Sequence, residues 1–196
     1  MIKFAFDRVF SFLGIAFLLP LFLGIAIWIG IDSRGGIFFV QERVGLKGRH
    51  FGLLKFRTMF PLSEQHGKLT VGAKDPRVTS AGYFLRKYKL DELPQLWNVL
   101  IADMSFVGPR PEVPEYVALY SEEQWKVLQV RPGITDEASI AYFEESELLS
   151  KSADPRKTYI EEVMPAKLKM NLEYLKRRSY IRDLEVIAKT LKRIIS

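Results

Sequence analysis

The sequence contains no cysteine and only two histidines, and both shortages exclude whole classes of chemistry. Without cysteine the chain has no disulfide, no thiolate metal site and no thiol nucleophile. His50 and His66 have no second histidine at a metal-ligand spacing such as His-x-x-x-His, so we expect neither to bind a metal. Internal repeats, low-complexity tracts and a second globular domain are lacking too. Acidic and basic side chains, by contrast, are plentiful.

The chain of 196 residues carries 29 Lys and Arg against 23 Asp and Glu, a net charge of +6. This excess predicts attraction to anionic lipid head groups, phosphorylated substrates or nucleic acid, and charge alone does not choose among them. The length suits one domain, and enough remains after a membrane segment to bury a core. The apolar residues are concentrated at the start of the chain.

Residues 9–31 are apolar apart from one serine, three glycines and Pro20. A straight helix of this length would measure about 35 Å, enough to span a bilayer. A signal peptide is a poor interpretation, because no small-residue cleavage site follows and Trp28 lies near the end. Pro20 removes one backbone hydrogen bond in the middle of the run. Arg8 and Arg34 flank both ends, so a single span and a re-entrant hairpin both stay open.

Two short strands are predicted at residues 37–43 and 50–58, joined by a glycine-containing turn at 45–48. Strand side chains alternate with a period of two, which places Lys55 and Arg57 on one face. That face is either a phosphate-binding surface or a solvated strand face.

A helix capped by Ser80 is expected to run to about residue 89, and a second follows the dyad Asp91-Glu92. In the second helix Pro94 is tolerated in the opening turn, and the apolar positions share one face: Leu93, Leu96, Trp97 and Leu100. The dyad would then lie at a helix N-terminus, where the helix dipole favours an anion, so we expect Asp91 to be ionised. Capping is the simpler role for such a pair. Basic residues on both sides argue for a polyanionic substrate instead: Arg86, Lys87, Lys89 and Arg110.

Further helical patterns follow. Residues 111–120 predict a short helix, and a capping box at 121–124 predicts another. Nearby aromatic residues are either core or lipid-interface residues: Tyr116, Tyr120 and Trp125. Two amphipathic helices are expected after residue 155, and the last is either a packing helix or a membrane-surface helix.

The string from Asp91 to Pro111 resembles the signature of the bacterial sugar transferase family, the monotopic phosphoglycosyl transferases. In that family an Asp-Glu pair followed by Leu-Pro-Gln-Leu, and later by Gly-Pro-Arg-Pro, forms the catalytic core. The mid-run Pro20, the Lys-Phe-Arg-Thr-Met block at 55–59 and Arg-Pro-Gly-Ile-Thr at 131–135 match as well. These matches extend over most of the chain.

The resemblance implies an α+β, mostly helical fold. Residues 1–34 would form a re-entrant membrane helix hairpin broken at Pro20, although Leu19 stands where the family commonly has serine. Residues 35–196 would form a small globular catalytic domain with a short β-hairpin and amphipathic interfacial helices. The implied location is the bacterial inner membrane, with this domain on the cytoplasmic face.

The implied activity is transfer of a sugar 1-phosphate from a UDP-sugar to polyprenyl (undecaprenyl) phosphate with release of UMP, the first membrane step of a bacterial glycan pathway. Asp91 would be the nucleophile and form an aspartyl phosphosugar. Mg²⁺ bound by Asp91 and Glu92 would offset the repulsion between anions. Arg86 and Lys55 complete the expected catalytic set.

Other residues are expected to bind substrate: Arg110, Arg57, Pro109, Arg131 and Asp183. Capping is the simpler role for Asp183, which opens the last helix. Many family members have Thr-Gly where this chain has Thr-Asp at 135–136, and we regard that segment as a candidate for distinguishing sugars.

Two rival functions remain open, a membrane-bound lipid-linked phosphatase and a non-catalytic module that binds anionic lipid. The expected partners are the UDP-sugar, polyprenyl phosphate and membrane lipid, with no nucleic acid, and a homodimer is left open. The sequence does not identify the sugar.

Overall fold

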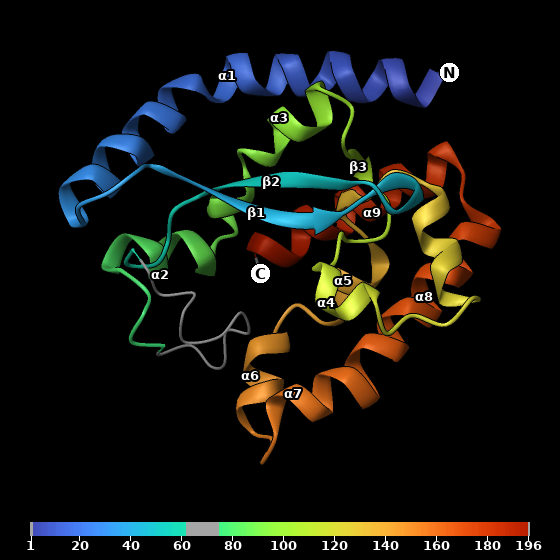
Figure 1. Cartoon of the computed structure of the whole chain (residues 1–196). Helices are drawn as coiled ribbons and strands as arrows, with labels where there is room; N and C mark the ends of the chain where they lie inside the picture. Colours follow the sequence, from blue (N-terminus) through green and yellow to red (C-terminus); the bar gives the residue numbers. More distant parts are fainter. Residues whose placement is uncertain (1, 62–74, 196) are drawn as a thin grey trace.

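The computed structural model describes residues 2–61 and 75–195, and helices dominate it (Figure 1). His66 lies outside the described residues. The helices are α1 (Ile2–Asp32), α2 (Ser80–Lys87), α3 (Gln95–Leu100), α4 (Pro114–Val117), α5 (Glu137–Ala141), α6 (Glu145–Ser150), α7 (Pro155–Thr158), α8 (Met164–Arg177) and α9 (Tyr180–Ile195). The strands are β1 (Phe38–Val44), β2 (His50–Phe56), β3 (Ser105–Val107) and β4 (Gly133–Thr135). Short helical turns are η1 (Leu46–Gly48), η3 (Leu90–Glu92), η4 (Gln124–Gln129) and the π-helical η5 (Tyr159–Val163).

Helix α1 is long and apolar enough to cross a membrane, and it continues through Pro20. Figure 1 shows its axis bending part-way along. A proline removes one bond of the helical ladder, so a bend without a break is a normal outcome. The structure therefore has one bent helix where the family resemblance implies a hairpin. A break that returns the chain to the same face stays a prediction.

The second half of α1 packs on the rest of the chain. Ile25 and Ile29 are buried against Phe56 of β2 and Leu85 of α2. At the end of α1 the Asp32 carboxylate accepts a hydrogen bond of 3.0 Å from the main-chain nitrogen of Ala81. The first half also contacts the domain, since Lys3 pairs with Asp183 and Ser11 is buried, while many other apolar side chains of α1 are exposed, as lipid would require. The expected domain division at residue 34 stays a prediction.

The predicted β-hairpin is confirmed. Strands β1 and β2 pair in antiparallel register, with Phe39 opposite Lys55. Because alternate residues share a face, Gln41 and Arg43 of β1 lie on the same side as Lys55. This side of the hairpin faces a large cavity.

A second, parallel pair of strands, β3 and β4, was not predicted. It joins Ser105 to Gly133 and Val107 to Thr135. A Cβ on Gly133 would lie 2.2 Å from the main-chain nitrogen of Gly108, so both motif glycines are required for this close approach. The pairing brings the Gly-Pro-Arg-Pro segment beside the residues that follow β4.

The main core lies among α4, η4, η5 and α8. The capping box is confirmed, since Ser121 and Gln124 each accept a hydrogen bond from the main chain of the other, although the turn that follows is a 3₁₀ helix. Tyr116 belongs to this core, whereas Trp125 is exposed. The helices expected after residue 155 are present as α7, η5 and α8 in succession and as α9. Apolar residues of α9 are exposed, and a membrane-surface role for this helix stays a prediction: Ile181, Leu184 and Leu191.

Candidate active site

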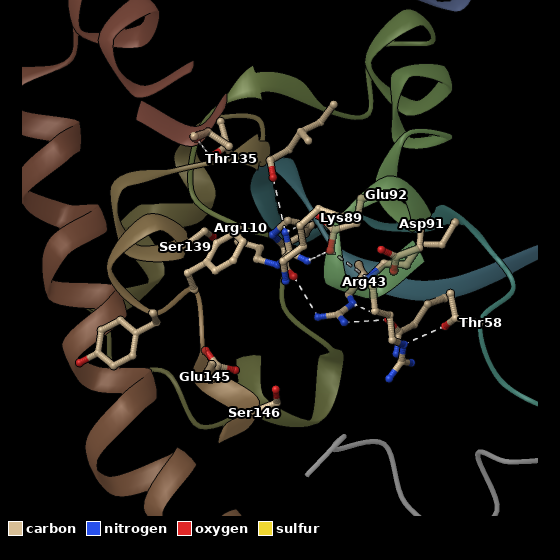
Figure 2. Close-up of a pocket in the computed structure, with 18 of the residues that line it drawn as sticks. Arg43, Thr58, Lys89, Asp91, Glu92, Arg110, Thr135, Ser139, Glu145 and Ser146 are labelled. Atoms are coloured by element: carbon tan, nitrogen blue, oxygen red, sulfur yellow. Dashed lines mark hydrogen bonds and ion pairs between the residues drawn. The ribbon is translucent and has the colours of Figure 1, made fainter. Parts of the chain in front are cut away.

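A cavity of about 1560 Å³ lies between the β1–β2 hairpin, η3 and helices α5, α8 and α9. It is lined by most of the residues for which a catalytic or phosphate-binding role is expected: Lys55, Arg86, Asp91, Glu92 and Arg110. Figure 2 shows Asp91 and Glu92, which share one turn, beside Arg110 from another segment. We call these five residues the dyad cluster.

The dyad precedes helix α3 instead of opening it. Lys89 has a left-handed backbone (φ 55°), and Asp91 and Glu92 then form the short 3₁₀ turn η3. Helix α3 begins at Gln95, after Pro94. The expected start of this helix at the dyad is thus wrong, because the chain reverses locally at Lys89 and α3 starts only beyond Pro94. The reversal turns Asp91 inward, where only 7% of the residue is exposed.

Glu92 is held by two cations. Arg110 donates from both terminal nitrogens to the two Glu92 oxygens, with Nη1 at 3.0 Å from Oε2, and the Lys55 Nζ lies 3.6 Å from Oε1. Burial alone would raise the pKa of Glu92, but Arg110 and Lys55 outweigh it and hold this pKa well below its usual range. Glu92 is therefore an ionised, oriented carboxylate.

Asp91 differs sharply from its neighbour. Its Oδ1 is buried and has no hydrogen-bond partner among residues 2–61 and 75–195. Burial, assisted by the adjacent Glu92 charge, raises the pKa of Asp91, and Lys55, Arg86 and Lys89 oppose that rise. The expected stabilisation of an Asp91 anion by a helix dipole is thus wrong, because Asp91 does not open a helix and burial raises the pKa of its carboxyl. An oxygen kept without a partner in a polar cavity is available to a ligand.

The cations around Asp91 are themselves buried. Burial lowers the pKa of Lys55 to about 8, against the pull of Glu92. Arg86 of α2 donates from Nε to the Thr58 hydroxyl at 2.9 Å. Helix α2 sits close enough for this contact because Gly82 has no side chain, since a Cβ there would lie 2.0 Å from the Thr58 carbonyl oxygen.

Sequence reasoning missed one wall of the cavity. Arg43 of β1 donates from Nη1 to the Pro111 carbonyl oxygen at 3.0 Å and to Glu112 at 3.2 Å, and Tyr159 donates its hydroxyl to the same Glu112 carboxylate. Strand alternation places Lys55 on the face toward the cavity, and with the hairpin register known it places Arg43 on the same face. The pairing of Arg43 with Glu112 joins segments far apart in sequence and had no local signal.

Asp136, at the departure from the family pattern, was also missed as a positioning residue. Its Oδ2 accepts a hydrogen bond of 3.0 Å from the main-chain nitrogen of Arg110, and its Oδ1 accepts one from the nitrogen of Ser139 at 2.6 Å. The carboxylate thus caps α5 and fixes the backbone that carries Arg110.

The remaining expected substrate-binding residues are not brought to the dyad. Arg57 borders the cavity, but its guanidinium donates to the turn after α1: to the Ser33 hydroxyl and the Ser33 carbonyl oxygen, both at 2.8 Å, and to the Gly36 carbonyl oxygen at 2.5 Å. Asp183 forms an ion pair with Lys3 and accepts a hydrogen bond from the Tyr174 hydroxyl.

Arg131 and Pro109 also serve the fold. Arg131 lies over the Phe4 ring at 4.6 Å and donates to the Ala102 carbonyl oxygen at 2.8 Å. The Pro109 carbonyl oxygen accepts from the Gly133 nitrogen at 3.0 Å. A substrate contact by Arg57, Asp183, Arg131 or Pro109 stays a prediction.

No group of three acidic or histidine side chains that could hold a metal occurs in the described ranges, 2–61 and 75–195. The dyad alone offers the unpartnered Asp91 Oδ1 beside a Glu92 engaged by Arg110. Mg²⁺ commonly takes one or two protein carboxylates and completes its octahedral shell with phosphate oxygens and waters. Two adjacent carboxylates are compatible with such an ion, and magnesium binding by the dyad stays a prediction.

The sequence profile of the bacterial sugar transferase family matches residues 1–196. The chain belongs to this family. A relative from Aeromonas hydrophila, named UDP-N-acetylgalactosamine-undecaprenyl-phosphate N-acetylgalactosaminephosphotransferase, is 35% identical and aligns with 100% of this chain and 44% of its own length. An undecaprenyl-phosphate glucose phosphotransferase from Komagataeibacter xylinus is 37% identical over 98% of this chain and 36% of its own length.

A third relative, from Caulobacter vibrioides, is a UDP-glucose:undecaprenyl-phosphate glucose-1-phosphate transferase, 33% identical over 97% of this chain and 68% of its length. This bacterial sugar transferase chain therefore spans less than half the length of the first two relatives. The three names share undecaprenyl phosphate and mention two sugars, N-acetylgalactosamine in the first and glucose in the other two.

Proposed function

We propose that the chain transfers a sugar 1-phosphate from a UDP-sugar to undecaprenyl phosphate and releases UMP. The observation that carries the proposal is the buried Asp91 oxygen, which has no partner among the described residues and lies in a cavity lined by Lys55, Arg86 and Arg110. A nucleophile beside several cations suits a substrate that is itself a polyanion. The names of the relatives support the same donor and acceptor classes.

The reaction takes two displacements at one phosphorus. An Asp91 oxygen forms a bond to the sugar-proximal phosphorus, and the bond from that phosphorus to the bridging oxygen breaks, so UMP leaves with the bridging oxygen. A phosphate oxygen of undecaprenyl phosphate then attacks the same phosphorus, and the bond to Asp91 breaks. A carboxylate needs no base to become a nucleophile once the surrounding cations have stabilised its ionised form.

The cations are held ready by the fold. Arg110 is fixed through its side chain by Glu92 and through its backbone by Asp136, and Arg86 is fixed by Thr58. Such pre-positioned charge stabilises a phosphoryl transition state without reorganisation. Mg²⁺ held by Asp91 and Glu92 would supply further positive charge against the repulsion between the dyad and the diphosphate.

The proposed acceptor, undecaprenyl phosphate, gives a reason for the long apolar helix α1. Undecaprenyl phosphate keeps its chain in lipid and its phosphate at the surface, so the dyad must lie near that surface. We propose that α1 inserts in the bacterial inner membrane with the dyad cluster on the cytoplasmic face, where it serves the first membrane step of a glycan pathway. The Trp28–Phe84–Tyr88 ring contacts at the end of α1 suit an interfacial position.

The test is UMP release in detergent with Mg²⁺, across a panel of UDP-sugars, with and without undecaprenyl phosphate. Intact mass should reveal a phosphosugar adduct on Asp91 that disappears when the acceptor is added. Release only when both substrates are present, without an adduct, would overturn the two-step route. Release of free sugar phosphate to water would favour a phosphatase, and lipid binding without UMP release from any donor would favour a binding module.

A further inference from the structure

The cavity is lined by two residues with an uncharged polar atom that forms no hydrogen bond to any described residue. The Ser139 hydroxyl oxygen on α5 and the Asn171 Oδ1 on α8 are buried and have no hydrogen-bond partner within the described parts of the chain, 2–61 and 75–195. Both residues line the same cavity as the dyad. In Figure 2 Ser139 and Asp91 lie on opposite sides of Arg110. Ser139 therefore lies in a part of the cavity away from the Asp91 carboxylate, and α8, which carries Asn171, packs against α5, which carries Ser139.

Asn171 is an unusual occupant of its position. Only 4% of it is exposed, and the other buried positions on the same side of α8 are mostly apolar: Met164, Leu168 and Tyr174. Asn98, which is 2% exposed, provides a comparison. Its Oδ1 accepts from the Leu54 nitrogen at 3.0 Å and its Nδ2 donates to the Gly52 carbonyl oxygen at 2.8 Å. One buried amide thus holds β2 in place, and the other belongs to a residue that lines the cavity and has an oxygen without a partner among the described residues.

The surroundings of Asn171 suit a neutral group. Helix α5 packs against α8, and the cavity here is walled by apolar side chains of α8 and α9: Leu168, Ile187 and Leu191. Two of the cations that line the cavity on α8 and α9 are paired, Lys167 with Glu145 of α6 at 2.5 Å and Arg193 with Glu144 at 3.2 Å. Sites for small molecules commonly combine such apolar walls with a few polar groups that fix orientation. A phosphate would find more cationic partners on the other side of Arg110, where Lys55 and Arg86 lie.

We propose that Asn171 and Ser139 form the subsite for the uracil base of the nucleotide donor. The Asn171 Nδ2 donates to a uracil carbonyl oxygen, and uracil N3–H donates to Asn171 Oδ1, while the Ser139 hydroxyl bonds a remaining polar atom of the nucleoside. This inference rests on the proposed UDP-sugar donor.

The order of groups in a UDP-sugar places the base and the sugar at opposite ends of the diphosphate. The sugar is bonded directly to the phosphate that Asp91 attacks and so must lie close to Asp91. The base is removed from that phosphorus by the second phosphate and the ribose. With the diphosphate at Arg110, the polar groups beyond it meet the nucleoside.

The experiment measures binding of UMP and of ribose 5-phosphate to the full chain in detergent by calorimetry, for wild type, Asn171→Leu and Ser139→Ala. Wild type should prefer UMP. Asn171→Leu should weaken UMP binding about ten- to a hundredfold and leave ribose 5-phosphate unchanged, because the base loses two buried hydrogen bonds. Ser139→Ala should weaken UMP binding about threefold. Ser150→Ala, on the exposed side of α6, is the matched control and should change nothing.

Three results would overturn the assignment. Unchanged UMP affinity in Asn171→Leu, with an altered KM ranking among UDP-sugars, would make this a sugar subsite. Unchanged affinity for all ligands with a raised melting temperature would mean that Asn171 merely binds internal water. If Asn171→Leu fails to fold, full UMP affinity in Ser139→Ala overturns the assignment, because that change removes a hydroxyl with no protein partner. If the wild-type protein bound no uridine nucleotide, the result would instead contradict the proposed function.

Discussion

Two groups of charged side chains, similar in the sequence, have opposite uses in the fold. The dyad cluster gathers at the cavity, while an anchor cluster ties α1 and its following turn to the domain: Lys3, Arg57, Arg131 and Asp183. In the anchor cluster each charge is engaged by main-chain oxygens, a ring or an opposite charge. In the dyad cluster Asp91 keeps an oxygen without a partner among the described residues. Unused bonding capacity, more than charge itself, separates a site from a structural contact.

The largest expected effect comes from Asp91→Asn, which removes the nucleophile from the dyad cluster. UMP release should fall at least about a thousandfold, since the amide cannot form the phosphosugar bond. Folding should be unaffected because the Asp91 Oδ1 bonds no described residue. Coupled UMP assays and circular dichroism measure both, with Asp103→Asn outside the cavity as the control. Near-normal turnover in Asp91→Asn would show that the unpartnered oxygen is not the nucleophile.

Arg110→Gln should lower kcat/KM about a hundredfold. It removes a phosphate contact and leaves Glu92 without its two charge-assisted hydrogen bonds from Arg110. Steady-state kinetics with Arg110→Lys should show partial recovery. The control from the anchor cluster is Arg131→Gln, whose kcat/KM should stay within about threefold of wild type. Equal losses of kcat/KM in Arg110→Gln and Arg131→Gln would show that the two clusters do not differ in function.

Arg57→Gln should act on stability instead of chemistry. Its guanidinium binds Ser33 and Gly36 in the turn after α1 and is only 8% exposed, so its loss should cost about 2–4 kcal/mol of unfolding free energy. Denaturation in detergent measures the loss, and turnover per folded molecule at low temperature should be nearly unchanged. A hundredfold loss of turnover at constant stability would show that Arg57 takes part in catalysis, as the residues of the dyad cluster are expected to do.

Asp183→Asn should have the smallest effect. The ion pair with the partly exposed Lys3 is lost, yet the amide oxygen can still accept the Tyr174 hydroxyl, so the expected cost is about 0.5–1 kcal/mol. Thermal melts measure it, with Lys3→Met as the matched variant from the other side of the pair. If Asp183→Asn abolished turnover without a change in melting temperature, Asp183 would be a substrate-binding residue.

Local patterns were reliable where neighbours in sequence decide the structure. Alternation predicted the β1–β2 hairpin and the Ser121–Gln124 capping box formed as expected, whereas the apolar run left open a single helix and the re-entrant hairpin, and the structure has one continuous helix. The start of α3 was missed because Lys89 adopts a left-handed backbone that no local periodicity reveals. The β3–β4 pair was missed because its strands are three residues long and lie far apart in the chain.

The sequence alone determined the family, the long apolar N-terminal segment and the position of the Asp91-Glu92 pair in the family signature, because these depend on residue order and short-range periodicity. Tertiary structure decided which charges meet. Arg110 reaches Glu92, Asp136 reaches the Arg110 backbone, and Arg57 turns to Ser33 only once distant segments are packed. Burial likewise raised the pKa of Asp91 against the local helix-dipole expectation, because desolvation depends on everything that surrounds the carboxylate.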